Sequence, residues 1–169
     1  MKVLTGKVTK LPDNVNTDDI IPARYLSSMD LDAMTEHAFE DYDASLKEKV
    51  REGGIIVAGK NFGCGSSREH AVIVLKKAGL KAVIAESFAR IFFRNSINQG
   101  LLALQLEGSS EPIKDGDSVK IDLERFIVEN ETRSSIHRLR PIPPFLLSIL
   151  NEGGLVPYLK KRRGWGIEA

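Results

Sequence analysis

The amino-acid sequence predicts an α/β fold with a mostly parallel central sheet and an added antiparallel β layer. Three short apolar runs in the middle of the chain alternate with two helical segments, which is typical of parallel strands joined by helices. The segment that follows reads instead as consecutive strands around an acidic turn. No stretch has the composition of a linker, so we expect a single domain over residues 1–169.

The first third of the chain predicts one strand and two short helices. Residues 3–9 alternate weakly between apolar and polar side chains and are expected to form a strand. Residues 11–26 are rich in Pro, Asn and Asp, which indicates a long ordered loop. Asp30 can cap a short helix over residues 31–40. The charged residues 47–52 are expected to form a surface turn of helix.

The middle of the chain carries the pattern that defines the fold class. Three runs are apolar throughout and bounded by glycine or polar residues, as buried strands are. The two segments between them have helical patterns, the first ended by Gly79. In the order strand, helix, strand, helix, strand, the predicted elements are residues 53–59, 69–79, 81–87, 88–100 and 101–106.

The last third of the chain changes character. Residues 115–140 predict two or three antiparallel strands, with an acidic turn at residues 115–117. Residues 143–154 begin with proline and end with glycine, which favours a helix. The basic tail, residues 159–169, is expected to be partly disordered.

Composition excludes several classes of function. Apolar residues make up 42% and charged residues 28% of the chain, as in soluble globular proteins, and the net charge of +1 argues against nucleic-acid and membrane partners. The apolar run at residues 55–58 is too short to span a bilayer, and residues 1–6 lack the apolar core of a signal peptide. With Cys64 as the single cysteine, a cytoplasmic location is expected. One cysteine and three scattered histidines also predict no zinc or iron–sulfur site held by this chain alone.

The segment NFGCGSSREHA, residues 61–71, lies between a predicted strand and a predicted helix. The structural interpretation is a capping box, with Ser66 as N-cap and Glu69 as its reciprocal partner. A phosphate-binding P-loop would need a lysine that is missing, and a dinucleotide fingerprint would need glycine where Arg68 stands. A nucleophilic Cys64 is a further alternative, although no nearby residue marks a general base for it.

The same segment closely resembles the signature of the 3-isopropylmalate dehydratase small subunits, and it is similar to the C-terminal swivelling domain of aconitase. Three further segments resemble the same family: NTDDIIPARYL, KAVIAESFARIFFRNSINQGLL and GGLVPYLKKR. The resemblance therefore covers nearly the whole chain, in order and at the expected spacing.

This resemblance implies a stand-alone swivelling β/β/α domain that pairs with a large subunit. In the family, the large subunit carries a [4Fe–4S] cluster, and the hetero-oligomer is a hydro-lyase of leucine biosynthesis. It interconverts 2-isopropylmalate and 3-isopropylmalate, small dicarboxylic hydroxy acids, by removing and re-adding water. A chain that lacks its own cluster ligands agrees with this division between the subunits.

The resemblance also implies the role of each residue in the serine–serine–arginine motif. Ser66 matches the catalytic base, which takes a proton from carbon as hydroxide leaves to the cluster iron. Ser67 and Arg68 match positions that hold a substrate carboxylate, and we place Gly65 in the same binding set. The planar fork of an arginine suits a carboxylate. Asp18 and Asp19 are either catalytic carboxylates or residues that order their loop, and loop ordering is the favoured interpretation.

The loop after Tyr25 is expected to read the third group of the substrate. Homoaconitase-like subunits resemble YLRT there, with an arginine for an extra carboxylate, whereas this chain continues with Ser27 and Ser28. Burying a carboxylate without a cation is costly, which favours isopropylmalate. Arg24 could turn inward, so homoaconitate and dimethylmalate remain alternatives, and we include Arg24, Ser27 and Ser28 among the candidate substrate-binding residues. A non-catalytic binding domain of the same fold is the alternative from a different class.

Overall fold

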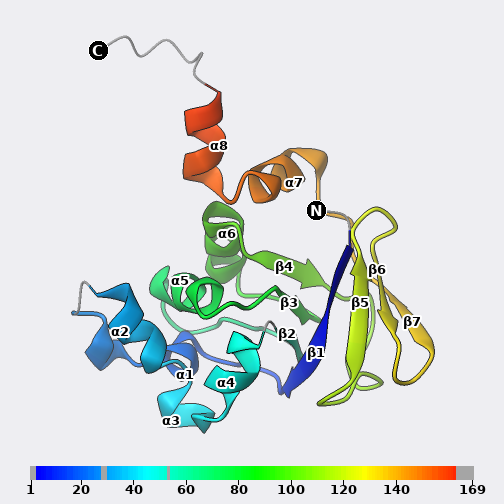
Figure 1. Ribbon diagram of the computed structural model, residues 1–169, viewed down its shortest axis with the longest axis horizontal. Coiled ribbons are helices and arrows are strands. Elements are labelled where there is room, and N and C mark those ends of the chain that lie inside the picture. The colour runs from blue at the N-terminus through cyan, green and yellow to red at the C-terminus, as the bar shows by residue number, and fades with distance from the viewer. Residues whose placement is uncertain (1–2, 28–29, 53, 163–169) are drawn as a thin grey trace.

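The computed structural model describes residues 3–27, 30–52 and 54–162, and its centre is one seven-stranded sheet (Figure 1). The order of strands across the sheet is β4-β3-β2-β1-β5-β6-β7. Neighbours from β4 to β1 are parallel, and neighbours from β1 to β7 are antiparallel. The strands are β1 (Val3–Leu11), β2 (Ile55–Ala58), β3 (Ala82–Ala85), β4 (Leu102–Gln105), β5 (Ser118–Asp122), β6 (Ile127–Asn130) and β7 (Ser135–Arg138).

Strand β1 joins the parallel and antiparallel parts of the sheet. Its first half, from Val3 to Lys7, pairs antiparallel with β5, and its second half, from Val8 to Leu11, pairs parallel with β2. The antiparallel strands therefore extend the same curled sheet instead of stacking on it. The predicted α/β class, with a parallel centre and added antiparallel strands, is confirmed.

The helices form three groups around this sheet (Figure 1). The crossover helices α5 (His70–Lys77) and α6 (Arg90–Gln99) pack against each other. Near the end of the chain, α7 and α8 pack together and contact α6. The remaining helices gather on one side, where α1 and α2 contact α5 and α4 contacts β1. They are α1 (Thr17–Ile20), η1 (Ala23–Tyr25), α2 (Leu31–Glu36), α3 (Glu40–Asp43) and α4 (Leu46–Arg51), while the two late helices are α7 (Pro144–Asn151) and α8 (Leu155–Lys161).

The parallel strands are buried on both faces, which explains their continuous apolar sequences. Along β2, Ile56 and Ala58 belong to the core under α1, α2, α4 and α5. Ile55 and Val57 face the opposite core, which includes residues of β5, β6, α7 and α8. Successive side chains of a strand point to opposite faces, so these four residues divide between two cores.

Most predicted elements are confirmed, one local prediction is wrong, and one helix was missed. The strands and helices of the middle segment, the three later strands, the helix after the double proline, and the N-cap at Asp30 all form as expected. The expected loop over residues 11–26 contains α1 and η1, and α3 was not predicted. In the basic tail, residues 159–161 belong to α8, and residues 163–169, on which the expectation of partial disorder falls, lie outside the described residues. Within the described ranges, no helix has the length and apolar character needed to cross a membrane.

Candidate active site

The candidate site lies where three parallel strands end. The loops after β1, β2 and β3 are joined by backbone hydrogen bonds, with Gly63 N–H donating to Val15 O at 2.8 Å and Phe62 N–H donating to Ser87 O at 3.0 Å. Ligands of parallel α/β sheets usually bind at this carboxyl edge. The motif of residues 61–71 is therefore held where binding is expected.

Two glycines shape the segment that leads to Ser66. Gly65 has φ of +95°, and a side chain there would overlap the amide group of Asn16. Gly63 has φ of +78°, and a side chain there would overlap the ring of Phe92. Only glycine fits such positions without strain, so the chain can turn between α1 and α6. Both glycines are therefore turn residues of the segment.

The Ser66 side chain is held by a buried hydroxyl from α1. Ser66 Oγ lies 3.2 Å from Thr17 Oγ1, and the Ser66 N–H donates to that same Thr17 oxygen at 3.2 Å. Thr17 is only 1% exposed, and its own N–H donates to Cys64 O at 2.8 Å. The Thr17 hydroxyl proton has three acceptors within reach, and Ser66 Oγ at 3.2 Å is nearer than Ser66 O at 3.4 Å or Asn16 Oδ1 at 3.5 Å.

Arg68 forms an ion pair with Asp18 on α1. The contact joins Arg68 Nη1 to Asp18 Oδ1, and the two side chains are 25% and 54% exposed. A guanidinium has five N–H donors, so this pairing leaves others open. Ser67 is exposed beside Arg68, and its carbonyl oxygen accepts from Asn95 Nδ2 of α6 at 3.4 Å. The segment of residues 65–68 thus lies against side chains from two helices, Thr17 and Asp18 of α1 and Asn95 of α6.

The predicted capping box at Ser66 and Glu69 is wrong. Helix α5 begins at His70, Glu69 occupies the N-cap position, and no side chain caps that end. The Glu69 carboxylate instead accepts from Gln99 Nε2 at 2.8 Å, so it is not available to Ser66. Ser66 lies in the loop before the helix.

A capping box does exist, but it opens α1. Asn16 Oδ1 accepts from Asp18 N–H at 2.9 Å, and Asp19 Oδ2 accepts from Asn16 N–H at 2.7 Å. The favoured interpretation of Asp19 as a loop-ordering residue is confirmed. This box fixes the turn that carries Thr17 and Asp18 to the site.

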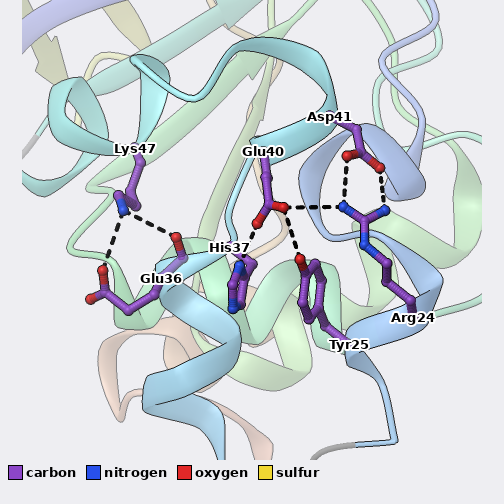
Figure 2. A network of polar contacts seen from close by, with 7 residues as sticks. All are labelled: Arg24, Tyr25, Glu36, His37, Glu40, Asp41 and Lys47. Atoms are coloured by element: carbon purple, nitrogen blue, oxygen red, sulfur yellow. Dashed lines mark hydrogen bonds and ion pairs between the residues drawn. The ribbon is translucent and has the colours of Figure 1, made fainter.

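Arg24 is engaged with α3, as Figure 2 shows. Its two terminal nitrogens donate to the two carboxylate oxygens of Asp41 at 2.6 and 2.7 Å, and one also donates to Glu40 at 3.2 Å. The hydrogen bond to Asp41 is the main reason that the pKa of Arg24 is raised, and it lowers the pKa of Asp41. The Arg24 guanidinium therefore has carboxylate partners within its own helix group.

The neighbouring Tyr25 belongs to the same network (Figure 2). Its hydroxyl donates to Glu40 at 2.8 Å, and its ring stacks on His37 with centroids 3.8 Å apart. His37 also contacts the other oxygen of Glu40. The hydrogen bond from Tyr25, followed by that from His37, lowers the pKa of Glu40. The contacts of Arg24 and Tyr25 thus run to α2 and α3. Ser27 is exposed after η1, and Ser28 lies outside the described residues.

The donor set of this chain does not fit an iron–sulfur cluster. Such clusters are held by several cysteine thiolates, and Cys64 is the single cysteine of the chain. Cys64 is half-buried, with Sγ donating to Val15 O at 3.7 Å. Across the described ranges, no group of three or more His, Cys, Asp or Glu side chains is arranged to hold a metal ion.

Two residues of the site were missed in the sequence. Thr17 was overlooked because the segment around it was assigned to a loop, although Asn16 and Asp19 have capping-box spacing before an apolar pair. Asn95 lies within a helical pattern and carries no local signal that separates it from a surface residue. Its contact with Ser67 depends on how α6 packs.

Comparison with known proteins assigns the chain to a family. Residues 5–109 match the model of the aconitase C-terminal domain, which defines the class of the fold. The chain is 48% identical to the 3-isopropylmalate dehydratase small subunit of Thermodesulfovibrio yellowstonii, covering 94% of this chain and 95% of the relative. It is 51% identical to the 3-isopropylmalate dehydratase small subunit of Nautilia profundicola, and the match covers 95% of this chain and 96% of the relative. A crystal structure of 3-isopropylmalate dehydratase from Methanocaldococcus jannaschii is 46% identical and superimposes with a TM-score of 0.89, covering 95% of each chain. The chain therefore belongs to the 3-isopropylmalate dehydratase small subunits of the aconitase superfamily, which are hydro-lyase subunits of leucine biosynthesis.

Proposed function

We propose that this chain contributes the proton-abstracting and carboxylate-binding half of a 3-isopropylmalate dehydratase active site, which a large subunit completes. The complex would interconvert 2-isopropylmalate and 3-isopropylmalate by removing and re-adding water. The observation that carries the proposal is the contact of Ser66 with Thr17, next to the Arg68–Asp18 ion pair, at the carboxyl edge of the sheet. We also infer that residues 1–169 act as one swivelling domain, which the continuous sheet supports.

In this proposal Ser66 is the base. The C–H bond of the substrate breaks as its proton forms an O–H bond with the ionised Ser66 Oγ, the C–H electron pair forms a C=C bond, and the hydroxyl on the neighbouring carbon leaves as hydroxide. An alkoxide can only accept hydrogen bonds, and the Thr17 hydroxyl is a donor within 3.2 Å. The positive charge of Arg68, two residues on, lowers the cost of that anion further. Because α5 begins only at His70, Ser66 lies before the first turn of the helix, and the helix dipole adds little to the stabilisation of this anion.

Arg68 and Ser67 are the proposed carboxylate-binding residues, with Gly65 providing close backbone approach. Asp18 engages Nη1 of Arg68, and the other guanidinium donors have no partner among residues 3–27, 30–52 and 54–162. Asp18 also holds the fork in place, so little side-chain freedom is lost on binding. Ser67 is exposed and can donate its hydroxyl to the same carboxylate.

The proposed substrate has an apolar third group. In the segment around Tyr25, Arg24 is the cationic side chain that could turn inward to bind a third carboxylate of the substrate. Its bidentate pairing with Asp41, supplemented by Glu40, opposes that movement. Among the described residues of this segment, 23–27, no arginine is then free to meet a further carboxylate, which favours isopropylmalate or dimethylmalate over homoaconitate.

The proposed partner is a large subunit that carries the [4Fe–4S] cluster of the family. The single cysteine of this chain supports placing the cluster there, and it agrees with a cytoplasmic setting. The net charge of +1 supports a complex that binds neither nucleic acid nor membrane.

The test is turnover by the reconstituted complex with Ser66→Ala. We expect kcat to fall by about 10²- to 10⁴-fold, the usual contribution of a positioned base. Circular dichroism and binding to the large subunit should stay as in the parent. Ser45→Ala, an exposed serine before α4, is the matched control and should retain parental kcat. A Ser66→Ala complex with near-parental kcat would rule out the base assignment.

The substrate choice is tested by assaying the parent complex on isopropylmalate, dimethylmalate, homoaconitate and citrate. We expect the highest kcat/KM for isopropylmalate. A preference for either tricarboxylic acid would overturn the choice. Absence of turnover on all four, in a complex with an intact cluster, would favour the non-catalytic binding domain.

A further inference from the structure

A groove of about 360 Å³ lies beside the catalytic segment but does not include it. The loop after β3, the first turns of α6 and the end of β4 form its walls. The residues that line the groove are Ser87, Phe88, Arg90, Phe93, Arg94 and Gln105.

The groove carries two exposed arginines without acidic partners. Arg90 and Arg94 are four residues apart on α6 and so lie on the same side of the helix. Neither forms an ion pair within the described part of the chain, whereas Arg51 and Arg133 do. Two like charges at this spacing repel each other, and an anion between them removes that repulsion. A guanidinium also binds a carboxylate in a bidentate manner.

Aromatic side chains supply the apolar part of the groove. Phe88 and Phe93 are half-buried, and their ring centroids are 6.0 Å apart. Arginine combined with aromatic residues is the composition of the energetic centres of protein interfaces. The groove therefore suits a segment that has both carboxylates and an apolar side chain.

The groove is continuous with the candidate active site. Phe88 forms a backbone bridge with Phe62 of the catalytic loop, and their rings meet edge to face at 6.2 Å. Asn95, the residue after Arg94, donates to Ser67 O at 3.4 Å. A subunit that covers Ser66 must therefore approach the surface next to Arg90 and Arg94.

We propose that this groove docks an acidic segment of the large subunit. Its carboxylates would pair with Arg90 and Arg94, and an apolar side chain of the same segment would pack on Phe88 and Phe93. The proposal rests on the proposed function, since that function requires the large subunit. A second copy of this chain suits the groove less well, because a two-fold contact would bring the same cations together.

The experiment measures binding of the purified large subunit to the parent and to Arg90→Glu, Arg94→Glu and the double variant. We expect Kd to rise about tenfold for each single change and about 100-fold for both, because each reversal replaces attraction by repulsion. The parental Kd should rise steeply with salt, and that of the double variant should not. Lys7→Glu is the control, because Lys7 is an exposed lysine beside a cavity at the amino ends of β2 and β3. The Kd of this variant for the large subunit should stay within about twofold of the parental Kd.

Circular dichroism and melting curves establish that each variant folds. A folded double variant with parental Kd would overturn the proposal. An unchanged Kd with a raised KM in the saturated complex would also overturn it, since the groove would then bind substrate. A double variant that loses only self-association would overturn it as well, since the groove would then bind a second copy of this chain. The experiments distinguish failure of the proposed base, Ser66, from failure of the proposed docking groove. Ser66→Ala should lose turnover but keep Kd, whereas the double variant should regain parental kcat when the large subunit is in excess.

Discussion

At the scale of single residues, the hydroxyl of Thr17 connects two loops that are far apart in sequence. It accepts a hydrogen bond from the backbone of Ser66 and lies within reach of the Ser66 side chain. Because Thr17 is buried, water cannot replace either interaction. One side chain therefore both supports the fold and prepares the proposed base.

Replacing Thr17 by valine keeps the shape and removes the hydroxyl. We expect kcat of the complex to fall by about tenfold or more, as when one preorganised donor is lost. Stability should also fall by about 1–3 kcal/mol, because the Ser66 N–H loses its acceptor. Steady-state kinetics and urea unfolding measure the two effects.

Thr17→Ser is the matched control and should restore most of both losses. A Thr17→Val complex that is destabilised but has parental kcat would give Thr17 a structural role only.

At the scale of elements, a buried carboxylate fixes the antiparallel part of the sheet. Asp117, just before β5, has a 3% exposed side chain and accepts from Lys114 N–H at 2.8 Å, Asn130 Nδ2 at 2.7 Å and Arg133 Nε at 2.8 Å. Burial alone raises the pKa of Asp117, but these three hydrogen bonds, first that from the Lys114 backbone, outweigh it and lower the pKa to about 2. One carboxylate thus joins the turn before β5 to the end of β6.

This lowered pKa predicts how stability depends on pH. The folded pKa of Asp117 lies below the value of about 3.9 expected in the unfolded chain. The stabilisation is therefore complete above about pH 4 and is lost as the pH falls toward 2. In Asp117→Asn this acid-dependent loss should disappear, and stability at pH 7 should fall by about 1–3 kcal/mol because hydrogen bonds are broken.

Urea unfolding at several pH values from 7 down to 2 measures both effects. Glu131→Gln, at an exposed position close by in the chain, should behave as the parent. An Asp117→Asn variant that keeps the parental pH dependence would contradict the assignment.

The elements that the sequence predicted best are those whose pattern is local. The apolar runs of β2, β3 and β4 need no partner to be recognised, because strands buried on both faces must be apolar throughout. The motif at residues 61–71 was likewise found from its own residues. Its resemblance to a family gave the roles of Ser66, Ser67 and Arg68, which the experiments above test.

What the sequence could not predict depends on partners distant along the chain. Glu69 has the spacing of a capping residue, but α6 places Gln99 beside it and takes its carboxylate. Arg24 is a candidate substrate-binding residue, and α3, a helix that was not predicted, supplies its partners Asp41 and Glu40. In both cases packing between helices supplies a partner that the local sequence does not reveal.

At the scale of the whole molecule, the proposed function gives this chain half of a site and leaves the cluster ligands to the large subunit. Chelation or oxidation of the cluster should abolish turnover of the complex. In the described part of this chain, no arrangement of metal ligands occurs. The free chain should bind no iron, and its melting temperature should be unchanged by the chelator. Iron analysis and thermal unfolding measure this. A chelator-dependent drop in the melting temperature would reveal a structural metal in this subunit.

The central position of β1 affects the order in which a nascent chain can fold. Residues 3–11 leave the ribosome before the strands on either side of them, Ile55–Ala58 and Ser118–Asp122, have been synthesised. Pairing between strands so distant in sequence is slow, because a long loop must close first. During translation β1 therefore waits unpaired on its second side until β5 has emerged. An unfinished polypeptide cannot yet present the finished carboxyl edge, so productive assembly with the large subunit must follow synthesis of most of this chain.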